Sequence, residues 1–276
     1  MQFESLTLQA PLNSYVESIF YYNGFIPDHS IERVVPTGHL FVIFELDGFP
    51  RNTFDNNTLK PVKTFRRVWI SGMHNHYLSI SAHQDSEMFV IQFKPYGSFP
   101  FLHIPVDQLN NKVLQGEELL GDEIINIRDQ ILQAADVDQK FRVAEDWLNS
   151  RFDLQKTPEK EIVRVIQKLM QSPIAEHHEI IKSYSKTQKH LINQFKKYCG
   201  LTPKLLHRIM RFNEVLQKIN QKEKLEWSYI AYHCGFSDQS HFIKEFKEFS
   251  GFNPQEFVNM NMHQKETNFF PLDGEE

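Results

Sequence analysis

Features that define several other classes of protein are scarce in this sequence. It has two cysteines among 276 residues, too few for a disulfide framework, which favours a reducing compartment. No run of about eighteen apolar residues occurs, so we expect no transmembrane helix and no membrane partner. The N-terminus lacks a basic segment followed by an apolar one, so we expect no secretory signal and a cytoplasmic location.

Sequence signals of catalysis are also missing. The chain has no Gly-rich phosphate-binding loop. Cys199 and Cys234 have no convincing base partner, so we expect both to be buried as small hydrophobes. The sequence therefore predicts no catalytic residue, no enzyme activity and no cofactor.

The charge is distributed unevenly along the chain. The net charge is −5, but residues 157–263 carry 16 Lys and Arg against 11 Asp and Glu. The rest of the chain carries 14 basic against 24 acidic residues. A basic segment joined to an acidic one suggests that the C-terminal part meets a polyanion.

Residues 1–104 have the pattern of a β-rich domain. Short apolar runs rich in β-branched and aromatic residues are bounded by turn signals. We expect strands in 41–46 (FVIFEL), 69–72 (WISG), 77–82 (YLSISA) and 88–93 (MFVIQF). The hydrophilic stretch 51–60 (RNTFDNNTLK) is expected to be a loop. Strands at this spacing favour a barrel or a sandwich.

The pattern changes to helical spacing after about residue 105. Apolar residues recur at three- and four-residue intervals in 117–132 and 139–152. Thr157 followed by Pro158 predicts the start of a further helix. We expect a helical extension and linker over 105–156, helices from 157 to about 262, and a flexible tail over 263–276. The fold class is then α+β, with an N-terminal β-barrel-like (cupin-like) domain.

One segment occurs twice in the C-terminal part, 51 residues apart. Residues 190–203 read HLINQFKKYCGLTP, and 241–254 read HFIKEFKEFSGFNP. The turn residues Gly200 and Pro203 match Gly251 and Pro254. Internal repeats indicate a repeated structural unit, and two copies suit a pair of modules that grip one extended partner.

The second copy predicts a helix-turn-helix. A short helix begins at Trp227, and Gly235 follows it, where a turn needs positive φ. Ser237 or Asp238 is expected to cap the next helix. That helix, 239–250, has phenylalanines on one face and polar or basic residues on the other, which is typical of this motif.

The segment 230–257, IAYHCGFSDQSHFIKEFKEFSGFNPQEF, resembles the second helix-turn-helix of AraC/XylS-type transcription regulators. The first copy departs from the family pattern, with Ser185 where the family usually has glycine and Asn193 where it usually has arginine. Thr187 takes the capping position. The helix 203–219 resembles the family's linking helix, which implies that the two recognition helices enter successive major-groove segments about 34 Å apart.

The resemblance also implies which residues contact DNA. Base contacts are carried over to Gln239, Ser240, His241 and Lys244 in the second module, and to Lys189, Ile192 and Asn193 in the first. Gln and Asn can pair with adenine, Lys can donate to guanine, and Ile can contact a thymine methyl group. Phosphate contacts are expected from Arg208, Arg211, Lys196 and Lys247. Each of these polar residues could instead belong to a solvated helix face.

The N-terminal part resembles the N-terminal domain of a less-studied AraC-type subgroup. The resemblance rests on 34–39 (VVPTGH), 70–74 (ISGMH) and 93–97 (FKPYG), followed by the helical stretch. In related regulators such domains bind an effector, dimerise, or both.

The sequence thus predicts a cytoplasmic, sequence-specific DNA-binding transcription regulator of AraC type. The expected partners are double-stranded DNA, a small-molecule effector, a second copy of the chain, and RNA polymerase. One alternative is a metal-dependent β-barrel enzyme centred on His74 and His76, with His83 nearby, whose helical part only docks a partner. Another is a DNA-binding protein that needs no ligand.

Overall fold

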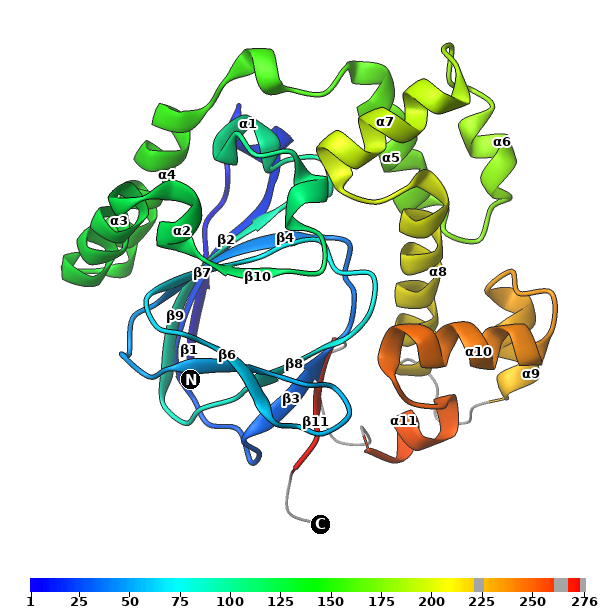
Figure 1. The fold of residues 1–276 in the computed structure, drawn as a ribbon, viewed down its shortest axis with the longest axis horizontal. Coiled ribbons are helices and arrows are strands. Elements are labelled where there is room, and N and C mark those ends of the chain that lie inside the picture. The colour runs from blue at the N-terminus through cyan, green and yellow to red at the C-terminus, as the bar shows by residue number, and fades with distance from the viewer. Residues whose placement is uncertain (221–225, 261–267, 274–276) are drawn as a thin grey trace.

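The structure is a computed structural model that describes residues 1–220, 226–260 and 268–273. Two antiparallel sheets with flanking helices form the N-terminal part, and a group of helices lies beside them (Figure 1). The α+β class is therefore confirmed. None of the helices in the described ranges has both the length and the apolar character needed to cross a bilayer.

The first sheet has the strand order β1-β2-β9-β4-β7-β10, and all its pairings are antiparallel. Its strands are β1 Gln2–Ser5, β2 Val16–Phe25, β4 Leu40–Glu45, β7 Val68–Ser71, β9 Ser86–Phe93 and β10 Val113–Gln115. The strands predicted from the apolar runs at 41–46, 69–72 and 88–93 are confirmed as β4, β7 and β9. Strand β10 lies within 105–156, which was expected to be helical, and it is held there by pairing with β7.

The second sheet has the order β11-β3-β8-β5-β6. Its strands are β3 Ile31–Val34, β5 Arg51–Phe54, β6 Pro61–Phe65, β8 Leu78–Ser81 and β11 Phe269–Pro271. The expected loop 51–60 is therefore wrong at its start. Arg51 and Thr53 are buried in β5 although they are polar, so the hydrophilic sequence wrongly predicted a loop.

The two sheets face each other, and no pairing joins them among the described strands. The barrel-like expectation is thus refined to two sheets that do not close. The two faces of the first sheet contact different clusters of side chains, and strand β4 shows this because its alternate residues point to opposite faces. Val42 and Phe44 pack in the main core with helix residues such as Trp147, whereas Ile43 belongs to a separate cluster with Trp69 between the sheets.

Four helices flank the first sheet. They are α1 Phe99–Leu102, α2 Gly116–Leu120, α3 Asp122–Gln133 and α4 Val137–Arg151. Short 3₁₀ helices lie at Leu12–Ser14, Val106–Leu109 and Leu154–Lys156. The predicted helix 117–132 is split at Gly121, whose φ of 65° and ψ of −155° are incompatible with a continuous helix. The predicted helix 139–152 corresponds to α4.

The C-terminal helices are α5 Lys160–Gln171, α6 His177–Ile181, α7 Gln188–Cys199, α8 Pro203–Asn220, α9 Trp227–His233, α10 Gln239–Ser250 and α11 Pro254–Met260. The predicted cap at Thr157 is wrong, because α5 begins at Lys160 after Glu159. The Thr157 hydroxyl instead donates to the Leu154 carbonyl at 2.8 Å.

The tail predicted over 263–276 is also wrong in part. Phe269–Pro271 forms β11, which pairs with β3 of the N-terminal part. The burial of Phe270 against Phe257 of α11, with ring centroids 4.5 Å apart, explains why this polar-looking tail is ordered there. Residues 261–262, expected to end the last helix, and 263–267 and 274–276 of the tail lie outside the described residues.

Candidate DNA-binding surface and effector pocket

The repeated sequence segment is a repeated structural unit. Helices α7 and α10 each have 12 residues, and each is capped by a side chain that accepts from a backbone N–H, Thr187 from His190 and Asp238 from His241. The predicted cap at Thr187 is confirmed, and of the two candidates for the second helix Asp238 is the cap. Both helices end at a glycine in the left-handed conformation, Gly200 and Gly251.

The outer face of α10 carries the residues predicted to contact bases. Gln239, Ser240, His241 and Lys244 are all exposed. The opposite face is buried through Phe242, Phe246 and Phe249. The turn before α10 contains Gly235 with φ of 72°, as its sequence predicted. The second module is therefore a formed helix-turn-helix that presents its polar face to solvent.

The corresponding face of α7 is less polar. Lys189 and Asn193 are exposed, and Ile192 is half-buried. The turn before this helix lacks a glycine, and the Ser185 N–H and hydroxyl instead donate to the Glu161 carboxylate of α5 at 2.7 and 2.8 Å. The first module thus holds its turn by a contact to a neighbouring helix.

The four predicted phosphate-binding residues divide into two pairs. Lys196 and Lys247 are exposed. Arg208 and Arg211 of α8 are instead bound to Glu245 of α10, each with a shortest N–O distance of 2.8 Å. Arg208 also pairs with Glu248 at 2.7 Å.

Arg208 and Arg211 therefore hold the linking helix against the second recognition helix. Arg211 further lies over the Phe236 ring, 4.3 Å from its centroid, and donates to the Gly235 carbonyl at 3.3 Å. These contacts use donors that a DNA phosphate would need, so phosphate contact by Arg208 and Arg211 stays a prediction that the intramolecular geometry disfavours.

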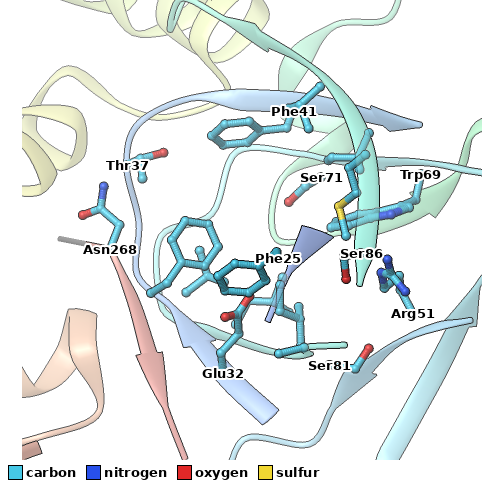
Figure 2. A pocket seen from close by; sticks show the side chains of 18 of the residues that line it. Phe25, Glu32, Thr37, Phe41, Arg51, Trp69, Ser71, Ser81, Ser86 and Asn268 are labelled. Atoms are coloured by element: carbon cyan, nitrogen blue, oxygen red, sulfur yellow. The ribbon is translucent and has the colours of Figure 1, made fainter. Parts of the chain in front are cut away.

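A pocket of about 710 Å³ lies between the two sheets (Figure 2). Its walls are largely apolar and aromatic, and include Phe20, Phe41, Phe65 and Trp69. This volume lies within the range of small-molecule sites, about 300–1,000 Å³.

Arg51 of β5 is the buried cation of this pocket, with 3% of its surface exposed. One guanidinium nitrogen, Nη2, pairs with Asp47 and with Glu45 Oε2 at 3.0 Å. The Trp69 indole N–H donates to the other oxygen of Glu45 at 2.6 Å. Burial raises the pKa of Glu45 to about 7, although Arg51 and Trp69 oppose that shift.

The histidines of the metal alternative do not form a metal site. His74 and His76 lie between β7 and β8 and not on a strand; His74 lines the pocket and His76 is exposed. Burial lowers the pKa of His74 to about 4. His83 stacks on Phe49. Within residues 1–220, 226–260 and 268–273, no three His, Cys, Asp or Glu side chains are grouped as metal ligands.

Both cysteines are buried, as their sequence context predicted. Burial raises the pKa of the Cys199 thiol to about 12, so this thiol stays protonated and unreactive at neutral pH.

The N-terminal part contacts the end of the second recognition helix through Arg33 of β3. The guanidinium lies between the rings of Tyr77 and Phe252, 4.2 and 4.3 Å from their centroids. It also donates to the Ser250 carbonyl at 3.3 Å. A Cβ atom added to Gly251 would lie 2.5 Å from Arg33 Nη1 and 2.7 Å from Tyr77 Cζ, so a side chain at this position would have to displace both neighbours.

A second contact of this kind holds the first recognition helix. Asn110 donates through its side-chain amide to the Gly200 carbonyl, and Val106 packs beside it. Between the two contacts, Asn213 of α8 donates to the Pro36 carbonyl at 3.0 Å. The N-terminal part therefore touches both recognition helices and the helix that links them.

Comparisons with known proteins match the N-terminal and C-terminal parts of the chain to two different families. Residues 182–260 match the family described as a helix-turn-helix domain, and residues 7–115 match a domain of unknown function (DUF6597). No curated protein matches the sequence. The chain is a helix-turn-helix DNA-binding transcription regulator. A DUF6597 domain precedes its helix-turn-helix domain in the chain.

Several solved structures are similar. ToxT of Vibrio cholerae with an unsaturated fatty acid bound is 14% identical, with 91% of this chain and 98% of that chain covered and a TM-score of 0.46. The C-terminal domain of AraT, a response regulator from Geobacillus stearothermophilus, is 18% identical, with 40% and 93% covered and a TM-score of 0.35. An AraC-type transcriptional regulator from Chromobacterium violaceum is 24% identical, with 35% and 87% covered and a TM-score of 0.31.

Three residues of these sites were not predicted from the sequence. Arg51 lies in a stretch that looks like a loop, and Arg33 and Asn110 gain their roles only through contacts with distant segments. Residues 51–53 are all polar, so no alternation of apolar and polar residues marks β5 as a strand in the sequence.

Proposed function

We propose that this regulator responds to a small molecule held in the pocket between its sheets. One observation carries the proposal. Glu32 and Val34 of β3 line the pocket, while Arg33 between them donates a hydrogen bond to the Ser250 carbonyl at the end of α10. Because successive residues of a strand point to opposite faces, a ligand that shifts the β3 backbone at Glu32 or Val34 would also shift Arg33 on the other face.

Two further elements are shared between the pocket and the DNA-binding part. Pro36 and Thr37 line the pocket, and the Pro36 carbonyl accepts from Asn213 of the linking helix. Asn268 and Phe269, which follow the second module in the chain, also line the pocket. A ligand in the pocket therefore adjoins segments that hold α8 and α10.

The response would be a shift between arrangements of the two recognition helices. A ligand changes such an equilibrium only by binding one arrangement more tightly than the other. Coupling free energies of about 1–3 kcal/mol are usual for such regulators, and they change DNA affinity by about 5- to 150-fold. The bound ligand would act through contacts at Arg33 and Asn213.

DNA reading would fall to the exposed faces of α7 and α10, which support base contacts by Gln239, Ser240, His241 and Lys244 and by Lys189, Ile192 and Asn193. Lys196 and Lys247 are exposed on the same helices and suit phosphate contact. A cytoplasmic location fits this activity. A homodimer and a contact with RNA polymerase stay predictions.

The test uses the full chain. Genomic fragments retained by the purified protein give a binding site, and the affinity for that site is then measured for two matched variants. Val90→Trp fills the pocket, whereas Val62→Trp places the same ring on the exposed strand β6. We expect Val90→Trp to change the DNA affinity at least about fivefold and Val62→Trp to leave it unchanged.

Circular dichroism and thermal unfolding establish that both variants are folded. A folded Val90→Trp protein with unchanged DNA affinity would contradict effector sensing and favour the ligand-independent alternative. Failure of the unmodified chain to retain any DNA fragment at low salt would contradict the proposed DNA-reading surface.

A further inference from the structure

The pocket combines an aromatic wall with a few buried polar atoms that have no hydrogen-bond partner within the described part of the chain. Side chains such as Phe20, Phe41 and Trp69 supply the apolar surface. Figure 2 shows Arg51, Ser86 and Trp69 on one side of the cavity, and Thr37 and Asn268 on the opposite side. A ligand that spans the cavity would therefore meet one polar group at each end.

Arg51 supplies hydrogen-bond donors at the first end. Its Nε and Nη1 atoms are buried and have no hydrogen-bond partner among the described residues. Leaving a buried donor of this kind unpaired costs about 1–3 kcal/mol, and more for a charged group. An oxygen acceptor on a ligand could satisfy one of these N–H groups, because Nε and Nη1 point in different directions and one oxygen does not reach both.

Asn268 supplies an acceptor at the second end. Its Oδ1 atom is buried and has no partner in the described part of the chain. Its backbone carbonyl, by contrast, is already used and accepts from Val35 N at 3.1 Å. A ligand N–H or O–H group at this end would therefore bind the segment that leads into β11.

The charges around the pocket argue against an acidic ligand. Arg51 is already opposed by Asp47 and by Glu45, whose carboxyl is partly ionised near neutral pH. Glu32 adds a further carboxylate to the lining. The pocket histidines do not offset this, because burial lowers the pKa values of His39, His74 and His83 and keeps them neutral.

Burying a ligand carboxylate here would place a further negative charge beside a guanidinium that is already neutralised. An unpaired charge in such surroundings is disfavoured by several kcal/mol. A neutral carbonyl oxygen carries no such penalty and can still accept from an unpaired N–H of Arg51. The polar atoms of the pocket therefore favour an uncharged ligand that forms hydrogen bonds.

We propose that the pocket binds an uncharged molecule with a ring-containing apolar body, a carbonyl-type oxygen at Arg51 and an N–H or O–H donor at Asn268. This inference rests on the proposed function, since it names the class of effector for the same pocket. It distinguishes the protein's ligand from fatty acids and other carboxylates.

The test compares two fluorescent probes with the same three-ring body, an anthracene carboxamide and an anthracene carboxylate that each carry an amino group on the opposite terminal ring. Binding to the full chain is measured at neutral pH by fluorescence polarisation. We expect the amide to bind at least about tenfold more tightly than the carboxylate, which corresponds to about 1.4 kcal/mol. Val90→Trp, which fills the cavity, should abolish binding of the amide.

Variants at the two polar ends locate the interaction. Arg51→Lys keeps a cation beside Asp47 but removes Nε and the planar fork, and should weaken amide binding about tenfold. Its matched control is Arg67→Lys, at a half-exposed ion pair with Glu117 outside the pocket, which should have no effect. Asn268→Leu should weaken amide binding about threefold and tests the proposal even if Arg51→Lys does not fold.

Equal or tighter binding of the carboxylate would overturn the proposal, as would failure of both probes to bind. Unchanged amide binding in Asn268→Leu and in a folded Arg51→Lys protein would also overturn it. DNA selection by the same preparation is a separate measurement, so a failed ligand class can be distinguished from a failed DNA-binding function.

Discussion

Gly200 and Gly251 end the two recognition helices, and a side chain of the N-terminal part contacts each of them. Their φ values of 75° and 77° are nearly the same. Asn110 binds the carbonyl of the first, and Arg33 lies against the second. The N-terminal part therefore contacts the repeated unit at the same position in both copies, the glycine that ends each helix.

The contact at Gly251 can be tested by adding a single methyl group. Gly251→Ala should destabilise the protein both because of its positive φ and because the new Cβ would lie 2.5 Å from Arg33 Nη1. Gly48→Ala is the matched control, since φ is 82° there and nothing lies within 4 Å of the added Cβ. We expect about 1 kcal/mol for Gly48→Ala and at least about 1 kcal/mol more for Gly251→Ala, measured by urea unfolding.

The excess should depend on Arg33. In a double-mutant cycle with Arg33→Ala, the difference between Gly251→Ala and Gly48→Ala should fall by about half, because the Tyr77 ring also lies within 2.8 Å of the added Cβ. An excess that is unchanged without Arg33 would show that Arg33 does not constrain the end of α10.

The buried carboxylate Glu245 is predicted to fix the second recognition helix to α8. Its side chain is 3% exposed and faces both Arg208 and Arg211. Glu245→Ala leaves the two guanidinium groups without this partner, and we expect a loss of about 2 kcal/mol in the free energy of unfolding. Glu248→Ala is the control, because that side chain is 48% exposed and pairs with Arg208 at the surface.

We expect Glu248→Ala to change the free energy of unfolding by less than about 0.5 kcal/mol. Similar losses for the two alanine variants would argue that Glu245 does not organise the contact between α8 and α10. Hydrogen exchange at the backbone amides of α10 would show whether the loss is local to this helix.

Lys244 and Lys247 are both exposed on α10, and their roles in DNA binding should differ. Lys244→Ala should relax base preference at one step, with a loss of about 1–3 kcal/mol on the selected site and a smaller loss on random DNA. Lys247→Ala should weaken binding to both DNAs alike and lower the salt slope by about one unit. Equal losses on both DNAs for Lys244→Ala would contradict its assignment to base contact.

Glu45 is predicted to make stability fall as pH rises. Burial raises its folded pKa from 4.5 to about 7, so the folded state holds a proton that the unfolded state releases. Stability contributed by the protonated group is present below about pH 4.5 and is lost as pH rises through about 7. Arg51, Asp47 and Arg128 are the charged groups that influence this carboxyl.

Glu45→Gln isolates the effect, because the amide cannot ionise. The stability of the unmodified protein relative to Glu45→Gln should fall by about 2 kcal/mol from about pH 5 to about pH 8. A difference that stays constant over this range would show that Glu45 titrates normally in the folded protein.

The DNA-binding part could be predicted from local sequence signals. The phenylalanine spacing of 239–250, the capping Asp238 and the turn Gly235 each act within a few residues, and all appear in the structure as predicted. Strands such as β4 and β9 were predicted for the same reason, since their apolar runs are continuous. Strand β5 was missed because its buried residues are polar, and their burial depends on the opposite sheet.

By itself the sequence determined the repeated unit and its helix-turn-helix form. Only the tertiary structure decided how these helices are held and what the pocket can bind. Arg33 lies 217 positions from Ser250, and Asn110 lies 90 positions from Gly200. Such contacts leave no local spacing in the sequence, because they form only when separate elements fold against each other. Arg51 likewise became a ligand-binding candidate only when two sheets buried it beside an aromatic wall.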